Sequence, residues 1–172
     1  VAEHPKAAAA PLQDLLHCGQ RLTLLGAAVV RVLRPEDHQG RLGRSFWRRL
    51  KTAGLIPPAT ELEWADDALI AAGHGITDLL KIPTPRDEAS DAALRAGVGP
   101  LWQKIAIWRP AAVVFIYKRG ATISAGRPLT ESWGQLEGVA LAGRPCFLMP
   151  GPYAAPEQVH EGLNFLRNLA AA

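Results

Sequence analysis

The chain has 172 residues, of which 48% are hydrophobic and 20% charged, a composition typical of one soluble globular domain spanning residues 1–172. Apolar runs stay short of the roughly 20 residues that a membrane-spanning helix needs, so we expect no membrane partner. The formal net charge of +3 permits an anionic partner without requiring one.

The N-terminal part predicts a flexible start, one strand and a polar loop. Residues 1–10 are rich in alanine and we expect them to be flexible, while the apolar spacing over 11–17 predicts a short helix. The apolar run Leu22–Leu25 predicts a buried strand that ends at Gly26. Residues 31–43 are polar and contain several breakers, which is typical of a loop that carries a functional site.

Helices and strands alternate through the middle of the chain. Ser45 can cap a helix that stops before Gly54. A capping-box pattern at residues 60–63 opens a helix that we expect to run to about Ala72. The glycine-flanked residues 73–77 predict a short strand or a turn, which a second polar loop follows.

The C-terminal half continues this alternation. Apolar residues at helical spacing predict a long helix over 90–108, and the uninterrupted apolar run at 111–116 predicts a buried strand. We further expect a helix that starts at 118–125, an irregular or strand-bearing surface segment over 134–143, a last buried strand over 146–149 and a terminal helix over 158–169.

This order of elements indicates the fold class and the place of the site. Short apolar strands that alternate with helices are typical of an α/β fold whose parallel sheet is covered on both faces. In such folds the functional site lies beyond the carboxyl ends of the strands. Three candidate loops begin there, at Gly26, at Thr77–Asp78 and at Met149–Gly151.

Cysteine usage and motif searches give no sign of a cofactor. The two cysteines, Cys18 and Cys146, are far apart and belong to no metal-binding pattern. We therefore expect reduced thiols, a cytoplasmic location and no metal. The sequence contains no Walker loop, no G-x-G-x-x-G at the start of a helix and no G-x-S-x-G. The expectation is a site that works without any cofactor.

Positive charge gathers in two parts of the sequence. One cluster includes Arg41, Arg44 and Arg48, and the other includes Lys118 and Arg119. Such clusters can contact phosphate groups. The alternative is that they form ordinary solvated helix faces, and the sequence leaves both readings open.

Four stretches, in order, resemble one family of repair enzymes. Residues 46–55 are similar to that family's Phe-Trp helix, and residues 75–84 to its glycine-x-threonine segment. Residues 94–115 continue the match. Residues 149–154 stand where the family has a proline-containing loop that enters the minor groove. The ordered set resembles the mismatch-specific uracil/thymine-DNA glycosylases of the uracil-DNA glycosylase superfamily.

The resemblance implies a three-layer α/β/α sandwich with a central, mainly parallel four-stranded sheet. It implies a monofunctional DNA N-glycosylase that removes uracil, or a related deaminated or mismatched base, in base excision repair. The target nucleotide rotates out of the duplex into a pocket before the N-glycosidic bond is hydrolysed. We expect a monomer without cofactors, acting on damaged DNA in a bacterial cytoplasm.

The sequence departs from the family at its catalytic position. After the first strand the family carries a water-positioning asparagine, and Ala28 stands in that place. Asp78 is the expected substitute, because a carboxylate can orient water and stabilise a cationic sugar. The alternative is that Asp78 caps the following turn. Asp87 is the second catalytic candidate.

The resemblance also assigns the remaining site residues. The base pocket is expected to involve Gly26, Ala27, Ala28, His38, Gln39, Phe46, Thr84 and Gly151. DNA contacts are expected from Arg41, Arg44, Lys118, Pro150, Pro152, Tyr153 and Ala154, with Tyr153 as a wedge in the base stack. His74 is a further loop histidine that can contact phosphate or base, although such a histidine is more often incidental.

Two readings of function remain open at this point. The first is an active glycosylase in which Asp78 replaces the missing asparagine. The second is a catalytically weak or inactive protein of the same fold that binds damaged DNA without turning it over. Ala28 favours the second reading, and Asp78 favours the first.

Overall fold

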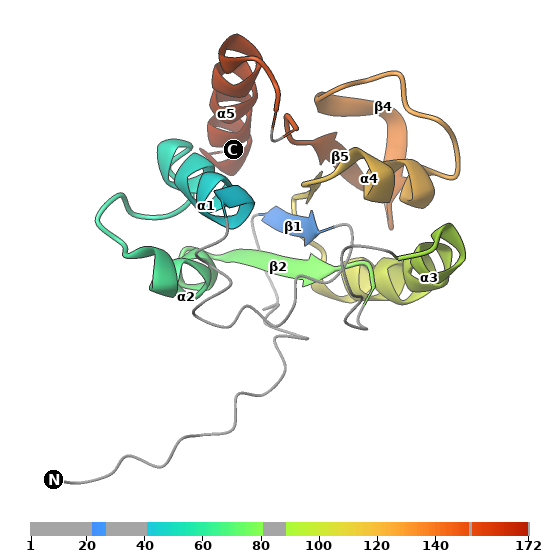
Figure 1. Cartoon of the computed structure of the whole chain (residues 1–172). Coiled ribbons are helices and arrows are strands. Elements are labelled where there is room, and N and C mark those ends of the chain that lie inside the picture. The colour runs from blue at the N-terminus through green and yellow to red at the C-terminus, as the bar shows by residue number, and fades with distance from the viewer. Residues whose placement is uncertain (1–21, 27–40, 81–88, 152, 172) are drawn as a thin grey trace, which may run out of the picture.

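The computed structural model describes residues 22–26, 41–80, 89–151 and 153–171. They form a mixed α/β fold in which strands and helices alternate along the chain (Figure 1). The predicted helix at 11–17 lies outside the described residues, as do most of the polar loop at 31–43 and the loop at 81–88.

The sheet has five strands in the spatial order β2-β1-β3-β5-β4. The first four of these run parallel to their neighbours, whereas β4 runs antiparallel to β5 at one edge. In chain order the strands are β1 (Leu22–Gly26), β2 (His74–Asp78), β3 (Ala112–Phe115), β4 (Gly134–Leu141) and β5 (Arg144–Leu148). The α/β prediction is confirmed.

The sheet therefore has one strand more than the four that were expected. The additional strand is β4, which comes from the segment predicted only as strand-bearing. Leu141 pairs with Arg144, so Ala142 and Gly143 form a two-residue hairpin loop. Both have a positive φ, 48° and 75°, as the hairpin turn that matches strand twist requires.

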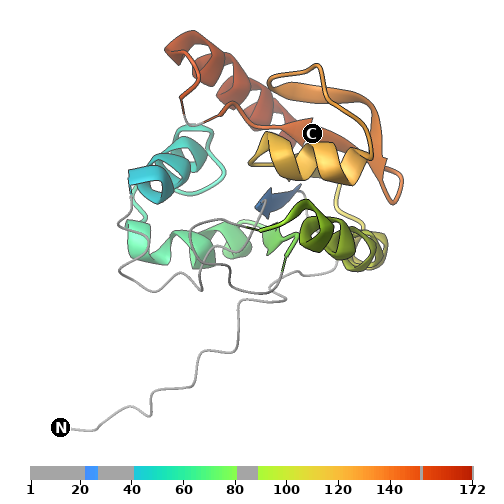
Figure 2. The ribbon, with the colours of Figure 1, turned by 45° about the vertical axis from the view of Figure 1, so that its right-hand side comes forward.

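Helices cover both faces of the sheet, and Figures 1 and 2 show them in two groups. Val113 and Phe115 point to one side, where they pack with α3 and α4. Ala112 and Val114 point to the other, where they pack with α1, α2 and α5. We call these groups the α3 layer, made of α3 (Asp91–Trp108) and α4 (Lys118–Ala125), and the α1 layer, made of α1 (Arg41–Thr52), α2 (Ala65–Ala71) and α5 (Pro156–Ala171).

The start of α1 differs from the prediction, while its end agrees. The helix begins at Arg41, so residues 41–43 are helical rather than part of a loop, and Ser45 lies inside the helix instead of capping it. At the other end Gly54 has a φ of 76°. The N–H groups of Gly54 and Leu55 bond back to the carbonyls of Lys51 and Leu50, the Schellman arrangement that ends many helices at a glycine.

The predicted helix over 60–72 is divided into two short pieces. A 3₁₀ turn, η3 (Leu62–Trp64), comes first and α2 follows it. The predicted capping box does not start the helix, because the N-cap position of η3 is Glu61 rather than Thr60, and Glu61 makes no side-chain cap hydrogen bond. By contrast, the Ser90 side chain accepts a hydrogen bond from the Ala93 N–H at 3.1 Å, which fixes the start of α3 as expected.

The register brings the carboxyl ends of the parallel strands to one edge. Gly26 pairs with Asp78, and Phe115 pairs with both Leu25 and Leu148. The element described after β1 belongs to the α1 layer, whereas β3 leads into the α3 layer. Neighbouring strands whose connections leave to opposite faces open a crevice at this edge.

Candidate functional site

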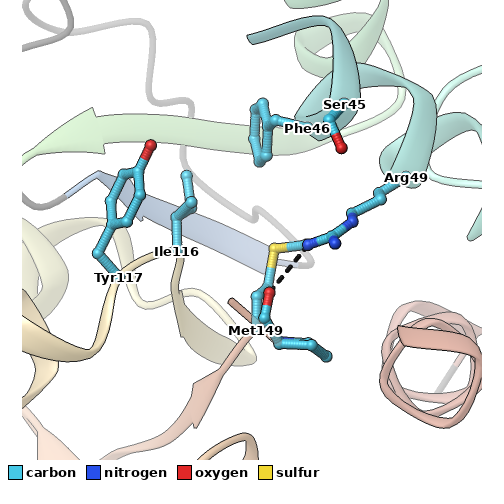
Figure 3. A pocket seen from close by; sticks show the side chains of 7 residues that line it. Ser45, Phe46, Arg49, Ile116, Tyr117 and Met149 are labelled. Carbon is cyan, nitrogen blue, oxygen red and sulfur yellow. Dashed lines mark hydrogen bonds between the residues drawn. The ribbon is translucent and has the colours of Figure 1, made fainter. Parts of the chain in front are cut away.

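A hollow lies at the carboxyl edge of the sheet, between α1 and the segments that follow β3 and β5. It encloses about 340 Å³ of empty space, including the solvent at its mouth. The residues that line it are Ser45, Phe46, Arg49, Ile116, Tyr117, Met149 and Pro150 (Figure 3).

Two aromatic rings line the hollow, and they are held in different ways. Phe46 packs edge-to-face against Trp47, with ring centroids 4.9 Å apart and an interplanar angle of 60°. Trp47 is itself 1% exposed, so the Phe46 ring rests on the core of the α1 layer. Tyr117 is 42% exposed and lies at the start of α4. In Figure 3 the side chain of Ile116 lies between these rings. Such a lining suits a flat, largely apolar ligand.

Arg49 joins the hollow to the loop after β5. Its Nη1 donates to the carbonyl oxygens of Pro150 at 2.9 Å and of Gly151 at 3.2 Å (Figure 3). Burial lowers the pKa of the Arg49 guanidinium from its ordinary value, but a guanidinium stays protonated in proteins. Hydrogen bonds from a charged donor are stronger than neutral ones, so Arg49 holds this loop firmly.

Further contacts fix the same loop. The Met149 N–H donates to the Phe115 carbonyl at 2.8 Å, which extends the pairing of β3 with β5. Pro150 is buried and packs over Gly162 of α5, where a Cβ would overlap the proline ring. Beyond it, the Ala154 N–H donates to the Gly151 carbonyl at 3.1 Å and closes a turn.

Tyr153 lies in this turn and is 86% exposed. Among the described residues, the exposed large hydrophobic side chains include none with a higher exposure. An aromatic ring this exposed gains nothing from the core of the protein, so its position is compatible with contact to a partner. Pro150, in contrast, lies on the buried side of the loop, against α5, and does not form the outer surface of the loop.

Asp78 occupies the last position of β2, opposite Gly26 of β1. It is half-buried, and Leu79 and Leu80 after it are buried. Gly97 of α3 packs directly against the Leu79 carbonyl, where a Cβ would overlap the oxygen. Asp78 is therefore at the same edge as the hollow, but β1 lies between β2 and β3, and Asp78 is not among the lining residues.

The other predicted site residues are placed as follows. Phe46 lines the hollow, Arg44 is half-buried on α1, and Lys118 is exposed beside Tyr117. Ala154 closes the turn that contains Tyr153. Arg41 begins α1, although its side chain is outside the described set. Ala27, Ala28, His38, Gln39, Thr84, Asp87 and Pro152 all lie outside the described residues.

His74 lies at the opposite end of the sheet. It begins β2 and is 5% exposed, so it cannot contact phosphate or base at the carboxyl edge. Sequence reasoning placed Met149 at the start of a candidate loop and Arg49 in a basic run, but it missed Ser45, Ile116 and Tyr117 as lining residues. Tyr117 could have been found, since it directly follows the end of the predicted strand at 111–116.

Two titratable groups near the sheet have structural explanations. Hydrogen bonds from Arg119 hold the pKa of the Asp91 carboxyl below its ordinary value, and this pair links the starts of α3 and α4 at 2.7 Å. Burial raises the pKa of the Cys146 thiol to about 11. Cys146 is therefore protonated at neutral pH and lacks the thiolate that a nucleophile needs.

Within the described part of the chain, no group of three or more His, Cys, Asp or Glu side chains could hold a metal ion. No helix among these residues is long and apolar enough to cross a membrane. No model of a known protein family matches the chain, and no curated protein sequence matches it.

Proposed function

We propose that this chain is a monofunctional DNA N-glycosylase that removes uracil, or a related deaminated or mismatched base, by base flipping. One observation carries this proposal. Phe46, Asp78 and Pro150 come from three of the segments that resemble uracil/thymine-DNA glycosylases, and all three lie at the carboxyl edge of one sheet. The proposal includes the three-layer arrangement of that superfamily.

The proposal places the flipped base against the aromatic side chains at this hollow. A pyrimidine is flat and mostly apolar on its faces, so it can stack on an aromatic side chain. Phe46 and Tyr117 supply two rings, and stacking of a base on an aromatic ring contributes about 1–3 kcal/mol. In this proposal the hollow at α1, β3 and β5 holds the flipped base, and the exposed Tyr153 fills its place in the duplex.

Asp78 would act on the sugar and on water. As the N-glycosidic bond breaks, its electron pair leaves with the base and positive charge develops on the sugar. An ionised Asp78 stabilises that charge and orients a water molecule, whose oxygen bonds to C1′ of the sugar. The proton released by the water passes to the carboxylate and then to the departing base, so the enzyme is regenerated.

Strand cleavage after alkali tests the proposal. Labelled oligonucleotides carry one uracil opposite G, opposite A or unpaired, and the wild type is compared with Asp78→Ala and Asp78→Asn. We expect cleavage by the wild type and a drop of about 10²–10⁴-fold in Asp78→Ala. Asp67→Ala is the matched control, because Asp67 is an exposed carboxylate of α2 away from the carboxyl edge.

The outcomes separate the parts of the proposal. Asp78→Asn with near wild-type cleavage assigns Asp78 to orienting water, whereas a loss as large as in Asp78→Ala means that the negative charge is needed. Cleavage that survives Asp78→Ala removes the role of Asp78 and moves attention to Asp87. No cleavage of any uracil substrate, with retained binding of the same oligonucleotides, favours a protein that recognises damaged DNA without catalysis.

A further inference from the structure

We propose that Arg49 is a positioning residue that presents Tyr153 to the DNA base stack, and that it couples Tyr153 to the base pocket. This inference rests on the proposed function, because it concerns how the same site would flip a base. The sequence alone does not indicate this role. Arg49 belongs to a run of basic residues, and such a run is equally typical of a solvated helix face.

The first step is that Arg49 donates hydrogen bonds to two consecutive carbonyl groups. One nitrogen, Nη1, donates to Pro150 O at 2.9 Å and to Gly151 O at 3.2 Å. A rigid, planar guanidinium that bonds to two adjacent carbonyls restricts the two peptide units to which these carbonyls belong. Arg49 and this loop are separated by about a hundred residues in sequence, so the contact is purely tertiary.

The second step is that one of these carbonyls, that of Gly151, begins the turn that carries Tyr153. Gly151 O accepts from Arg49 and also from the Ala154 N–H at 3.1 Å. The two hydrogen bonds share one acceptor, so the guanidinium fixes the point from which the turn starts. The Ala155 N–H then donates to Gln158 Oε1 at 3.3 Å, which ties the end of the turn to the start of α5.

The third step is that the side of the loop facing the core is already fixed, which leaves Tyr153 as its exposed part. Pro150 packs over Gly162, where no side chain larger than hydrogen fits. Tyr153 is 86% exposed and rests on this supported turn. A turn whose backbone is held in place before binding loses less conformational entropy when the ring that it carries enters the base stack.

The fourth step concerns coupling. Arg49 also lines the hollow with Phe46 and Tyr117, and Figure 3 shows its side chain extending from α1 towards Met149. One side chain thus contacts both the place proposed for the flipped base and the loop that replaces this base in the duplex. We infer that filling the hollow and inserting Tyr153 favour one another through Arg49.

A double-mutant cycle on base flipping tests this inference. The probe is a duplex in which 2-aminopurine neighbours a 2′-fluoro-2′-deoxyuridine, whose fluorine prevents cleavage while fluorescence reports unstacking. The flipping equilibrium is measured for the wild type, Arg49→Met, Tyr153→Ala and the double variant. We expect each single change to lower the equilibrium constant about tenfold. The double variant should be no lower than Tyr153→Ala, because Arg49 acts through Tyr153.

An additive cycle, in which the two single losses multiply in the double variant, overturns the proposal, because a general structural role of Arg49 predicts that result. Arg167→Met is the matched control. Its guanidinium donates to Thr52 O at 2.6 Å, so the change removes another arginine–carbonyl bond between α5 and α1, far from the loop, and should leave flipping unchanged. If Arg49→Met does not fold, Arg49→Gln replaces it in the cycle, since its amide keeps a donor.

This cycle also separates the two proposals. Coupled flipping without cleavage of an ordinary uracil substrate supports the role of Arg49 and rejects the glycosylase. Cleavage with an additive cycle keeps the glycosylase and rejects the role of Arg49. A wild type that neither flips nor cleaves rejects both.

Discussion

The two helical layers of this protein contribute to the carboxyl edge of the sheet in different ways. The α1 layer supplies side chains to the hollow there, with Phe46 and Arg49 in its lining. The α3 layer supplies close packing instead, since Gly97 lets α3 approach the Leu79 carbonyl just after Asp78. Substitutions in the α1 layer should therefore change ligand contacts, whereas those in the α3 layer should change the geometry on which the contacts depend.

The segment where β3 passes into α4 shows the same difference between residues that line the hollow and residues that pack. Tyr117 lies where β3 passes into α4, and it lines the same hollow as Phe46 and Arg49 of α1. Arg119, two residues further, bonds to Asp91 and to the Ala89 carbonyl and so holds the start of α3. Two residues at the start of α4 therefore differ in role, since Tyr117 lines the hollow and Arg119 holds the start of α3.

Among substitutions that test this difference between the layers, we expect the largest effect at Gly97 of the α3 layer. A methyl group in Gly97→Ala would overlap the Leu79 carbonyl, so we expect the free energy of unfolding to fall by about 1–3 kcal/mol. Gly99→Ala, on the same helix, meets no atom beyond its chain neighbours. Because Gly99 precedes Pro100 inside α3, a Cβ there disfavours the helical conformation, so we expect no gain and a loss smaller than at Gly97. Urea unfolding measures both, and equal effects at the two positions would contradict the close contact.

Tyr117 tests whether the α3 layer contributes a ligand contact of its own. Tyr117→Ala should raise KM for a uracil-containing duplex about tenfold, since a base stacked on an aromatic ring gains about 1–3 kcal/mol. Tyr117→Phe keeps the ring and should remain close to the wild type. Trp64→Ala removes another exposed aromatic, 58% exposed and distant from the hollow, and should leave KM unchanged. A tenfold change in Tyr117→Phe would mean that the hydroxyl, and not the ring, makes the contact.

The smallest expected effect concerns which layer faces the DNA backbone. Each cationic side chain that neutralises one phosphate contributes about 0.9 to the slope of log affinity against log salt. We expect Arg44→Ala in the α1 layer and Lys118→Ala in the α3 layer each to reduce that slope by about this amount. Arg95→Ala, an exposed cation of α3 paired with Asp91 at 3.9 Å, is the control with the same change in charge. If Arg44→Ala alone leaves the slope unchanged, the α1 layer does not contact phosphate.

The sequence by itself was sufficient for the elements that are buried or capped locally. The apolar runs of β1 and β3 predicted these strands, and Gly54 marked a helix end that the structure confirms. These signals are local, because hydrophobic burial and capping act within a few residues. The same local signals failed at residues 60–63, where a capping-box pattern is present but no side-chain cap forms.

Only the tertiary structure decided how the site is assembled. The sequence predicted that the carboxyl ends of the strands carry the site, and it named Phe46 and Tyr153. It did not reveal that Arg49 reaches Pro150 and Gly151, or that Gly162 makes room for the proline. Such contacts join segments that are distant along the chain, and they depend on how two layers pack against one sheet rather than on any local preference.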